Sequence, residues 1–430
     1  MANYKKRIAD ALILEKLSYM GAVLVQGPKW CGKTTTSEQI AKSILYLSDP
    51  ETSRANIELA NLKPKKILEG AYPRLIDEWQ EAPVLWDAVR FSVDHGKPGM
   101  YILTGSAVPP KADESDDKRR EIRHTGTGRI ARVTMRPMSL WESEESTGEA
   151  SISDLFAGAD ISGARAFAEL EGIVEMMCRG GWPAALGMKG RLARGPAREY
   201  CTAIAESDVS RVDGTLRDPD RVRRLMRSLA RLQGTQSAAA VIKADMKSND
   251  SDSLDEDTVY SYLRALRRIF VTEDLVAWCP NLRCKTPIRT SDTRYYVDPS
   301  IATTMLGAGS GELMDDVTTC GLVFETMAIR DLRCYAEALG GMLYHYHDKS
   351  GLECDAILCL ENGTYGLIEV KLGGEALIEK GVTSLLALSD RIDTTKMRKP
   401  SFKMVVVANG EFAYRRKDGV VICPLSALRP

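Results

Sequence analysis

The stretch that decides the fold is Gly27-Pro28-Lys29-Trp30-Cys31-Gly32-Lys33-Thr34, which fits the pattern G-x-x-x-x-G-K-[ST]. An apolar run, Ala22–Gln26, precedes it, and a helical pattern, Thr35–Ser43, follows it. The glycines let the backbone curl so that successive N–H groups point inward. The start of the following helix adds partial positive charge. The stretch therefore predicts a phosphate-binding loop between a strand and a helix.

The polar residues of this loop have predicted roles toward a nucleoside triphosphate. Lys33 brings positive charge to the β- and γ-phosphates, and the Thr34 hydroxyl is a ligand for Mg²⁺. The backbone from Gly27 to Thr35 is predicted to line the nucleotide. We expect Mg·ATP, although the sequence alone does not distinguish ATP from GTP.

A second element is the short apolar run Arg74-Leu75-Ile76, which ends in Asp77-Glu78. A strand that ends in two carboxylates after a phosphate loop predicts that Asp77 holds Mg²⁺ and that Glu78 polarises the attacking water.

A third element, Tyr101-Ile102-Leu103-Thr104-Gly105-Ser106, ends in hydroxyls. In a parallel sheet these strand ends form the ligand crevice, so Thr104 or Ser106 is a candidate to orient water or contact the γ-phosphate. A simple turn at the end of the strand is the alternative.

Arg129 precedes the predicted strand Ile130–Thr134. If that strand is parallel to the others, Arg129 lies at the edge of the sheet away from its own nucleotide. It then reaches a γ-phosphate only on a neighbouring subunit, which predicts a catalytic arginine supplied in trans by a homo-oligomer. Arg123 competes for the same role, and an ordinary surface arginine is the alternative.

The fold class predicted for residues 1–140 is α/β with a parallel sheet, because short apolar runs alternate with helical patterns. The five strands are expected at Ala22–Gln26, Ile44–Leu47, Arg74–Ile76, Met100–Leu103 and Ile130–Thr134. From Ser139 to Gln233 the sequence predicts helices, the first beginning at Ser139-Leu140-Trp141-Glu142, which has capping-box spacing. Two charged stretches, Lys111–Arg123 and Ser248–Asp257, are predicted to be mobile.

The chain has 430 residues, which predicts two to four domains. The net charge of -1 excludes a uniformly basic nucleic-acid-binding protein but permits local basic patches. The 10 cysteines form no CxxC pair and have no zinc spacing with histidine, so we expect reduced thiols. No apolar run is long enough to cross a bilayer, and the N-terminus lacks a signal-peptide core, which favours a cytoplasmic protein with no membrane partner.

The chain as a whole resembles a prokaryotic family of AAA-type P-loop ATPases that carry a C-terminal region of undefined function. The stretches that support this are VLVQGPKWCGKTT (23–35), RLIDEWQEAP (74–83), YILTGS (101–106), GRIARVTMRPMSLWE (128–142), RGGWPAAL (179–186), TRYYVDPSIA (293–302) and GLECDAIL (351–358) with GLIEVK (366–371). Only the first three are specific motifs. The resemblance implies ATP binding and hydrolysis, and it does not define a cellular task.

A helical lid or connector is expected at 141–217, and the segment from Pro219 to Val297 is expected to form three helices followed by a two-stranded ribbon. Residues 218–297 thereby resemble a winged helix-turn-helix. Glu256–Phe270 would be the recognition-type helix, with Arg264, Arg267 and Arg268 off its apolar stripe. The following ribbon carries Arg283, Lys285, Arg289 and Arg294, which suits phosphate contacts with DNA. The acidic start of the helix, Asp255-Glu256-Asp257, disfavours entry into the major groove, so an interface with a protein partner stays open beside DNA binding.

Residues 298–430 resemble the PD-(D/E)xK nuclease fold. Asp355 and the pair Glu369 and Lys371 follow the D…ExK pattern, and Glu325, in the predicted helix Leu322–Leu332, is the further acid that this fold usually contributes. Two acids on adjacent strands would hold Mg²⁺, with a lysine beside the attacking water. Loss of cleavage with the architecture kept is the alternative. His345 and His347 are expected to flank the sheet rather than to bind metal.

The sequence thus leaves three functions open. The preferred one is a Mg·ATP-dependent ATPase that transmits its nucleotide state to a protein partner or to DNA. The second is an ATP-gated DNA endonuclease, and the third is a nucleotide-dependent switch or scaffold that does not hydrolyse.

Overall fold

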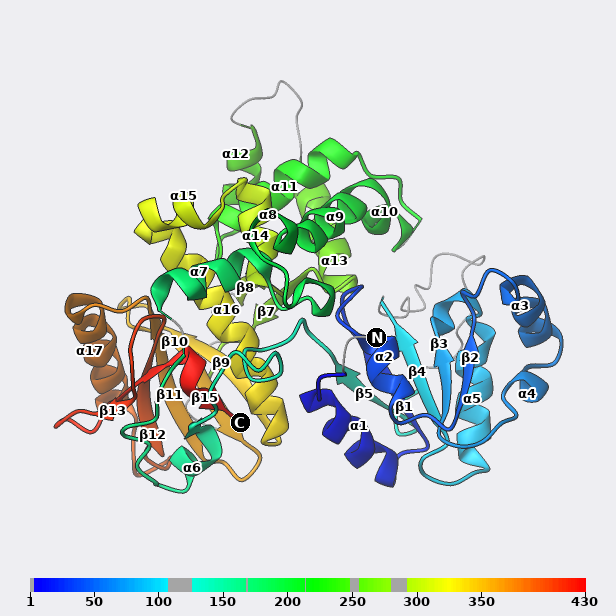
Figure 1. The fold of residues 1–430 in the computed structure, drawn as a ribbon, viewed down its shortest axis with the longest axis horizontal. Coiled ribbons are helices and arrows are strands. Elements are labelled where there is room, and N and C mark those ends of the chain that lie inside the picture. The colour runs from blue at the N-terminus through cyan, green and yellow to red at the C-terminus, as the bar shows by residue number, and fades with distance from the viewer. Residues whose placement is uncertain (1–3, 107–125, 168, 213, 248–254, 280–291) are drawn as a thin grey trace. The chain divides into compact units, whose positions relative to one another are not determined.

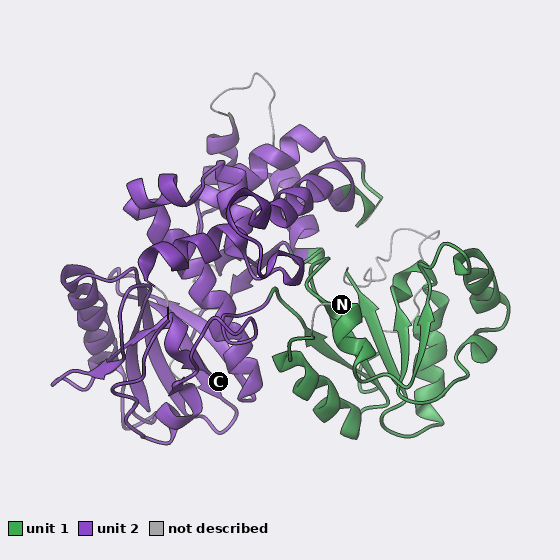
Figure 2. Cartoon of the chain, in the orientation of Figure 1, with its two compact units in different colours: residues 1–137, 210–215, 268–270 green, residues 138–209, 216–267, 271–430 purple. Residues whose placement is uncertain are grey.

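The computed structural model describes residues 4–106, 126–167, 169–212, 214–247, 255–279 and 292–430. The chain forms two compact units (Figure 2). The first unit comprises Met1–Pro137 with the short segments Ser210–Thr215 and Arg268–Phe270, and the second comprises the rest of the chain. Several predictions fall outside the described residues, namely those on the whole of Lys111–Arg123, on Arg283, Lys285 and Arg289, and on most of Ser248–Asp257.

The first unit contains a five-stranded parallel sheet with the order β2-β3-β4-β1-β5 (Figure 1). Its strands are β1 (Ala22–Gln26), β2 (Ser43–Tyr46), β3 (Arg74–Asp77), β4 (Tyr101–Gly105) and β5 (Ile130–Thr134). The predicted parallel sheet is therefore confirmed, and the bounds of β1 and β5 match the expectation. The carboxyl ends of β1, β3 and β4, three adjacent strands, carry the polar residues predicted for the nucleotide site.

Helices cover both faces of this sheet because its strand residues alternate between two apolar clusters. Val23 and Val25 pack with α1 (Ile8–Tyr19) on one face. Leu24 packs on the other face with residues of α5 (Val84–Asp94). Two further helices, α3 (Ser53–Leu62) and α4 (Pro64–Ile67), belong to the α5 side.

The helix after the phosphate loop is shorter than predicted. It was expected over Thr35–Ser43, but α2 ends at Glu38 (Lys33–Glu38). Three successive threonines lower its helix propensity, since β-branched side chains lose rotamer freedom in a helix. The amide of Lys42 then donates to the carbonyl of Pro73, at 2.8 Å, which draws the chain into β2.

The second unit begins with a stretch that corrects the predicted run of helices from Ser139. Between Ser139 and Glu169 the described residues hold a single short helix, α6 (Ile152–Phe156), and a two-residue strand, β6 (Ala150–Ser151). The capping-box hydrogen bonds of Ser139 and Glu142 do form, but turns follow them instead of a helix. Glycines with positive φ interrupt the segment, and β6 pairs with β15 (Leu428–Arg429) near the end of the chain.

Helices do follow from residue 170 onward. They are α7 (Leu170–Arg179), α8 (Gly190–Ala193), α9 (Gly195–Ala203), α10 (Val209–Arg211), α11 (Pro219–Arg231), α12 (Ala239–Lys247) and α13 (Glu256–Arg268). The last three precede an antiparallel ribbon of β7 (Thr272–Leu275) and β8 (Thr293–Tyr296). Three helices followed by a two-stranded ribbon is the order that the sequence predicts for residues 218–297.

The last part of the second unit is a six-stranded mixed sheet with the order β13-β14-β12-β11-β10-β9. Its strands are β9 (Gly341–His347), β10 (Glu353–Leu360), β11 (Tyr365–Lys371), β12 (Phe402–Val407), β13 (Tyr414–Arg415) and β14 (Val421–Pro424). Figure 1 shows α17 (Glu375–Arg391) along one face, where its Val382, Leu385 and Leu388 join the apolar core of the sheet. Before the sheet come α14 (Pro299–Leu306), α15 (Ser310–Asp315) and α16 (Val317–Ala338).

Two expectations about sequence chemistry are tested by the described residues. Among the described cysteines, eight form no disulfide and seven of these are buried, whereas Cys279 is disulfide-bonded, which corrects the expectation that the thiols are reduced. Among the described residues, no helix is both long and apolar enough to cross a membrane.

Candidate nucleotide site

The loop between β1 and α2 has the curled backbone that its glycines permit. Gly27 has φ 151° and Gly32 has φ 100°, both in the region that disfavours side chains. A Cβ atom on Gly27 would lie 2.1 Å from the carbonyl oxygen of Met135. Trp30 also has a positive φ, 64°, and its side chain is exposed. Gly27 is therefore required both by its conformation and by Met135, the residue after β5 that packs against it.

Lys33 lies inside this loop. Its side chain is buried, and Nζ donates a hydrogen bond of 2.8 Å to the carbonyl oxygen of Pro28. The ammonium group is thus held across the curl of the loop rather than extended into solvent. A buried ammonium with a single backbone acceptor is placed to exchange that acceptor for phosphate oxygens.

Three oxygen-bearing side chains meet at the ends of α2, β3 and β4. The Thr34 hydroxyl donates to Oδ1 of Asp77 at 2.7 Å, and the Thr104 hydroxyl donates to the same oxygen at 2.6 Å. Asp77 and Thr104 are buried. Hard oxygen ligands are those that Mg²⁺ prefers, and it keeps water and phosphate oxygens beside one or two protein ligands. Thr34 and Asp77 therefore fit a Mg²⁺ ion that is bound together with a nucleotide.

Glu78 follows Asp77 in a left-handed conformation, with φ 54°. Its amide donates to the Thr104 hydroxyl at 3.2 Å, and its carboxylate accepts a hydrogen bond from the Gln80 side chain. Burial raises the pKa of the Glu78 carboxyl above its usual value, while Lys33 and the Gln80 hydrogen bond oppose the shift. A carboxylate with a raised pKa suits a general base that works near neutral pH.

The structure separates the two hydroxyls predicted as alternatives at the end of β4. Thr104 contacts both acids, through Asp77 Oδ1 and the amide of Glu78, whereas Ser106 is buried and, within the described part of the chain, forms no hydrogen bond with either acid. Sequence reasoning missed Gln80, whose only signal was a polar residue two positions after the Asp-Glu pair.

Arg129 lies at the opposite edge of the same sheet. Its carbonyl accepts a hydrogen bond from the amide of Ala22, the first residue of β1, because β1 and β5 are parallel. Its guanidinium forms an ion pair with Asp94, with Nε 2.7 Å from Oδ1. Arg129 is therefore remote from the loop of its own chain, which is the premise of the predicted role in trans.

The four residues of the predicted C-terminal set lie close enough to influence one another electrostatically. Lys371 Nζ lies 3.0 Å from Asp355 Oδ2 and 2.6 Å from Glu369 Oε2, so its ammonium sits between the two acids. Glu325 accepts a hydrogen bond of 2.6 Å from the Tyr295 hydroxyl of β8. Among the described residues, no three His, Cys, Asp or Glu side chains are placed to hold a metal ion. Lys371 occupies the position between Asp355 and Glu369 where the nuclease hypothesis expects a cation.

Burial governs the titration of this carboxylate cluster. It raises the pKa of Glu325 to about 8, and the nearby Asp355 charge adds to the effect. The same two causes raise the pKa of Glu369 well above its usual value. Burial alone lowers the pKa of Lys371, but Asp355 and Glu369 outweigh it and raise that pKa. Burial thus favours the neutral form of Glu325 and Glu369, whereas the two acids beside Lys371 favour its protonated form.

A buried ionic network explains the loosely matched motifs of the second unit. Arg330, on α16, pairs with Asp298 at 2.8 Å and with Asp331 at 2.7 Å, and all three side chains are buried. Asp298 also accepts from the amide of Gly181 at 2.9 Å. Sequence reasoning did not single out these residues, although an aspartate before Pro-Ser is a helix-capping signal, and Asp298 does cap α14. We interpret the network as structural, since its buried charges pair with one another.

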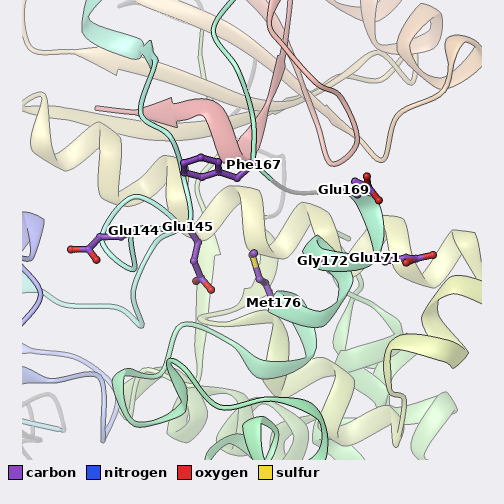
Figure 3. Close-up of a pocket in the computed structure, with 7 residues that line it drawn as sticks. All are labelled: Glu144, Glu145, Phe167, Glu169, Glu171, Gly172 and Met176. Atoms are coloured by element: carbon purple, nitrogen blue, oxygen red, sulfur yellow. The ribbon is translucent and has the colours of Figure 1, made fainter. Parts of the chain in front are cut away.

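An open pocket of about 490 Å³ lies in the second unit and is lined by Glu144, Glu145, Phe167, Glu169, Glu171, Gly172 and Met176 (Figure 3). Part of its acidic charge is compensated, because Glu145 forms a two-point ion pair with Arg179, with both N···O distances 2.6 Å. No sequence motif had pointed to this pocket.

Comparison with known proteins gives matches to three family models. Residues 20–144, which include the five-stranded parallel sheet and the phosphate loop, match the model of the AAA domain family. Residues 170–312 and 320–428 match two models that are each described as a domain of unknown function, DUF8612 and DUF4143. Among curated proteins, none matches the chain.

Two solved structures are similar in part. The Walker-type ATPase PABY2304 of Pyrococcus abyssi is 15% identical, with a TM-score of 0.41, over 70% of this chain and 96% of that chain. The ORC1 protein of Aeropyrum pernix, solved in complex with DNA, is 12% identical, with a TM-score of 0.24, over 71% of this chain and 93% of that chain.

Proposed function

We propose that this protein is a Mg·ATP-dependent ATPase of the AAA type. The observation that carries the proposal is that the hydroxyls of Thr34 and Thr104 both donate to one carboxylate oxygen of Asp77. This oxygen lies at the end of β3, and Thr34 directly follows Lys33 of the phosphate loop. Phosphate, metal and water sites in one crevice are what phosphoryl transfer to water requires.

Each residue has a distinct task in this proposal. The loop amides and Lys33 bind the β- and γ-phosphates, and Thr34 and Asp77 hold Mg²⁺. When bound, Mg²⁺ neutralises charge that develops on the phosphate oxygens. Glu78 accepts the proton of the attacking water, and its raised pKa matches that role.

Two variants test the ATPase. Calorimetry with Mg·ATP and Mg·GTP is expected to show binding to the wild type that Lys33→Ala abolishes. Glu78→Gln is expected to keep ATP affinity within a few-fold while steady phosphate release falls at least about a hundredfold, because the general base is lost. Binding without turnover in the wild type would favour the non-hydrolysing switch instead.

The proposal also includes coupling of the nucleotide state to DNA, which the surface of α13 supports. Its exposed face carries Tyr260, Arg264 and Arg267, although Arg267 also pairs with Asp274. Such a face contacts phosphates in winged helix-turn-helix proteins, and a protein partner is the alternative. A titration of fluorescent duplex DNA across salt concentrations tests it, with Arg264→Ala expected to weaken binding and to reduce the salt slope by about one. Absence of binding at low salt would exclude the DNA contact.

The ATP-gated endonuclease remains the second candidate because Asp355, Glu369 and Lys371 do converge. Cleavage requires a metal ion to take the place between the carboxylates that Lys371 holds. Plasmid nicking with Mg²⁺ or Mn²⁺ that Asp355→Ala abolishes would support this candidate. Intact plasmid under both metals would leave the cluster a charge-compensated structural element.

Supply of Arg129 in trans makes a homo-oligomer part of the proposal. Arg129 must leave Asp94 to reach a neighbouring subunit. Turnover per subunit is then expected to rise with protein concentration in the wild type and to stay low at every concentration in Arg129→Ala. Equal turnover in both proteins at all concentrations would show that Arg129 is an ordinary surface residue.

A further inference from the structure

Arg7, a buried arginine outside the sequence motifs, donates hydrogen bonds to the backbone of the nucleotide loop and of the segment after β5. Arg7 lies just before α1, and its side chain is only 6% exposed. Nη1 donates to the carbonyl of Cys31 at 2.8 Å, and Nη2 donates to the carbonyl of Arg136 at 2.7 Å. Asp10 fixes the segment, since it accepts from the amide of Arg7 at 2.9 Å. One guanidinium therefore joins the loop to the segment that follows β5.

The contact with Cys31 bears on phosphate binding through the geometry of the peptide bond. In a trans peptide the C=O and the N–H point in opposite directions. With the Cys31 carbonyl fixed toward Arg7, the amide of Gly32 in the same peptide points away from Arg7. Arg7 thus sets the orientation of one of the loop peptides whose amides are proposed to face phosphate.

Met135, in the segment after β5, makes further contacts with the loop and with the end of β1. The amide of Met135 donates to the carbonyl of Gln26 at 2.8 Å. The carbonyl of Met135 lies against Gly27, where a Cβ would meet it at 2.1 Å, and it accepts a weak hydrogen bond from Cys31 Sγ at 3.8 Å. A change in the peptides of the loop must therefore displace residues 135–136 as well.

These residues are the last ones before the chain enters the second unit. The main segment of the first unit ends at Pro137, and the amide of Met138 donates to the carbonyl of Gly181 within the second unit at 2.6 Å. Residues 135–137 therefore join the loop contacts directly to the first residue of the second unit along the chain.

We propose that Arg7 is a positioning residue that fixes the loop for phosphate and transmits its nucleotide state to residues 135–138. The inference rests on the proposed nucleotide binding and adds the route by which binding reaches the rest of the chain. Arg7 does not contact the reacting atoms; it acts through the carbonyls of Cys31 and Arg136.

Hydrogen–deuterium exchange on the full chain tests this with a non-hydrolysable ATP analogue and Mg²⁺. In the wild type, the analogue is expected to protect peptides that cover the loop and to change the exchange of peptides that cover residues 134–142. In Arg7→Met, loop protection is expected to remain at saturating analogue while the change at 134–142 disappears. The KM for ATP is expected to rise about tenfold, as loss of one charge-assisted hydrogen bond implies, and kcat to fall by less.

Two variants make the outcome decisive. Arg7→Lys keeps the charge but reaches one carbonyl, so it is expected to fall between the wild type and Arg7→Met, and it replaces Arg7→Met if that variant does not fold. Lys6→Met, on the exposed neighbouring residue, is the matched control and is expected to behave as the wild type. The inference is overturned if the analogue changes the exchange of peptides 134–142 in both Arg7 variants as it does in the wild type. It is also overturned if the analogue protects the loop of the wild type but leaves the exchange of peptides 134–142 unchanged. Absence of loop protection in the wild type overturns the nucleotide proposal with it.

Discussion

Thr104 illustrates how much one hydroxyl contributes to this site. It donates to Asp77 and accepts from the amide of Glu78, so it fixes both acids relative to each other. Glu78 has a left-handed backbone, and the hydrogen bond to Thr104 holds its amide in that conformation. We therefore propose that Thr104 positions the two acids, while its direct contact with water or phosphate stays a prediction.

We expect Thr104→Val to lower kcat about ten- to a hundredfold, because a buried hydrogen-bond partner of two groups is lost without a change of shape. Thr104→Ser, which keeps the hydroxyl, is expected to remain within a few-fold of the wild type. Steady-state phosphate release measures both. Equal rates for the valine and serine variants would mean that the hydroxyl does not position the acids.

The raised pKa of Glu78 predicts the acid side of the pH profile. Hydrolysis requires the ionised carboxylate, so kcat is expected to fall on acidification at a pH above that of an ordinary glutamate. The Gln80 hydrogen bond favours the ionised form, so Gln80→Met is expected to raise this pKa further and to move the acid limb to higher pH. The pH dependence of kcat under saturating ATP measures the shift; an acid limb that moves to lower pH would contradict it.

At the scale of elements, the Arg330 network holds four segments of the second unit together. Asp298 caps α14, Gly181 follows α7, and Asp331 accepts from the amide of Leu140 at 2.9 Å. The network lies in a buried region, where apolar side chains are more usual. Burying either carboxylate without the Arg330 guanidinium would cost free energy, because its charge would have no partner.

Arg330→Met is expected to lower the free energy of unfolding of the second unit by about 3–5 kcal/mol, since it leaves two buried carboxylates without a counter-charge. Arg391→Met removes an ion pair with Asp348 whose arginine side chain is 49% exposed, and it is expected to cost at most about 1 kcal/mol. Urea denaturation compares the two variants. Similar losses would mean that the network is compensated in some other way.

At the scale of the whole molecule, the chain is two compact units, and most of the match to the AAA domain family lies in the first. A ligand that binds one folded unit stabilises that unit by mass action. Calorimetric scans are therefore expected to show two transitions, of which Mg·ATP at about a hundred times its Kd stabilises one by about 2.7 kcal/mol. Lys33→Ala is expected to lose the shift and to keep both transitions. A single transition that moves as one would show that the units unfold together.

The sequence by itself determined the parallel sheet, its five strands and the loop between β1 and α2. These features are local: alternation with helical patterns marks parallel strands, and glycine spacing marks the curl of the backbone. The order of three helices and a ribbon before the last sheet was readable for the same reason. Helices were wrongly expected from Ser139, because the hydrogen bonds of the capping box form without a helix when glycines with positive φ and a distant strand redirect the chain.

The tertiary structure alone decided what Thr104, Gln80, Arg7 and Arg330 do. Each acts on a residue that is brought near by folding, in most cases far along the chain, as Arg7 does on Arg136. It also decided that Lys371 lies between Asp355 and Glu369, whereas the spacing of the three residues suits a metal site equally well. Sequence pattern records which groups are available, but contacts between distant segments fix which of them satisfy one another, because a buried polar group takes the partner that the fold provides.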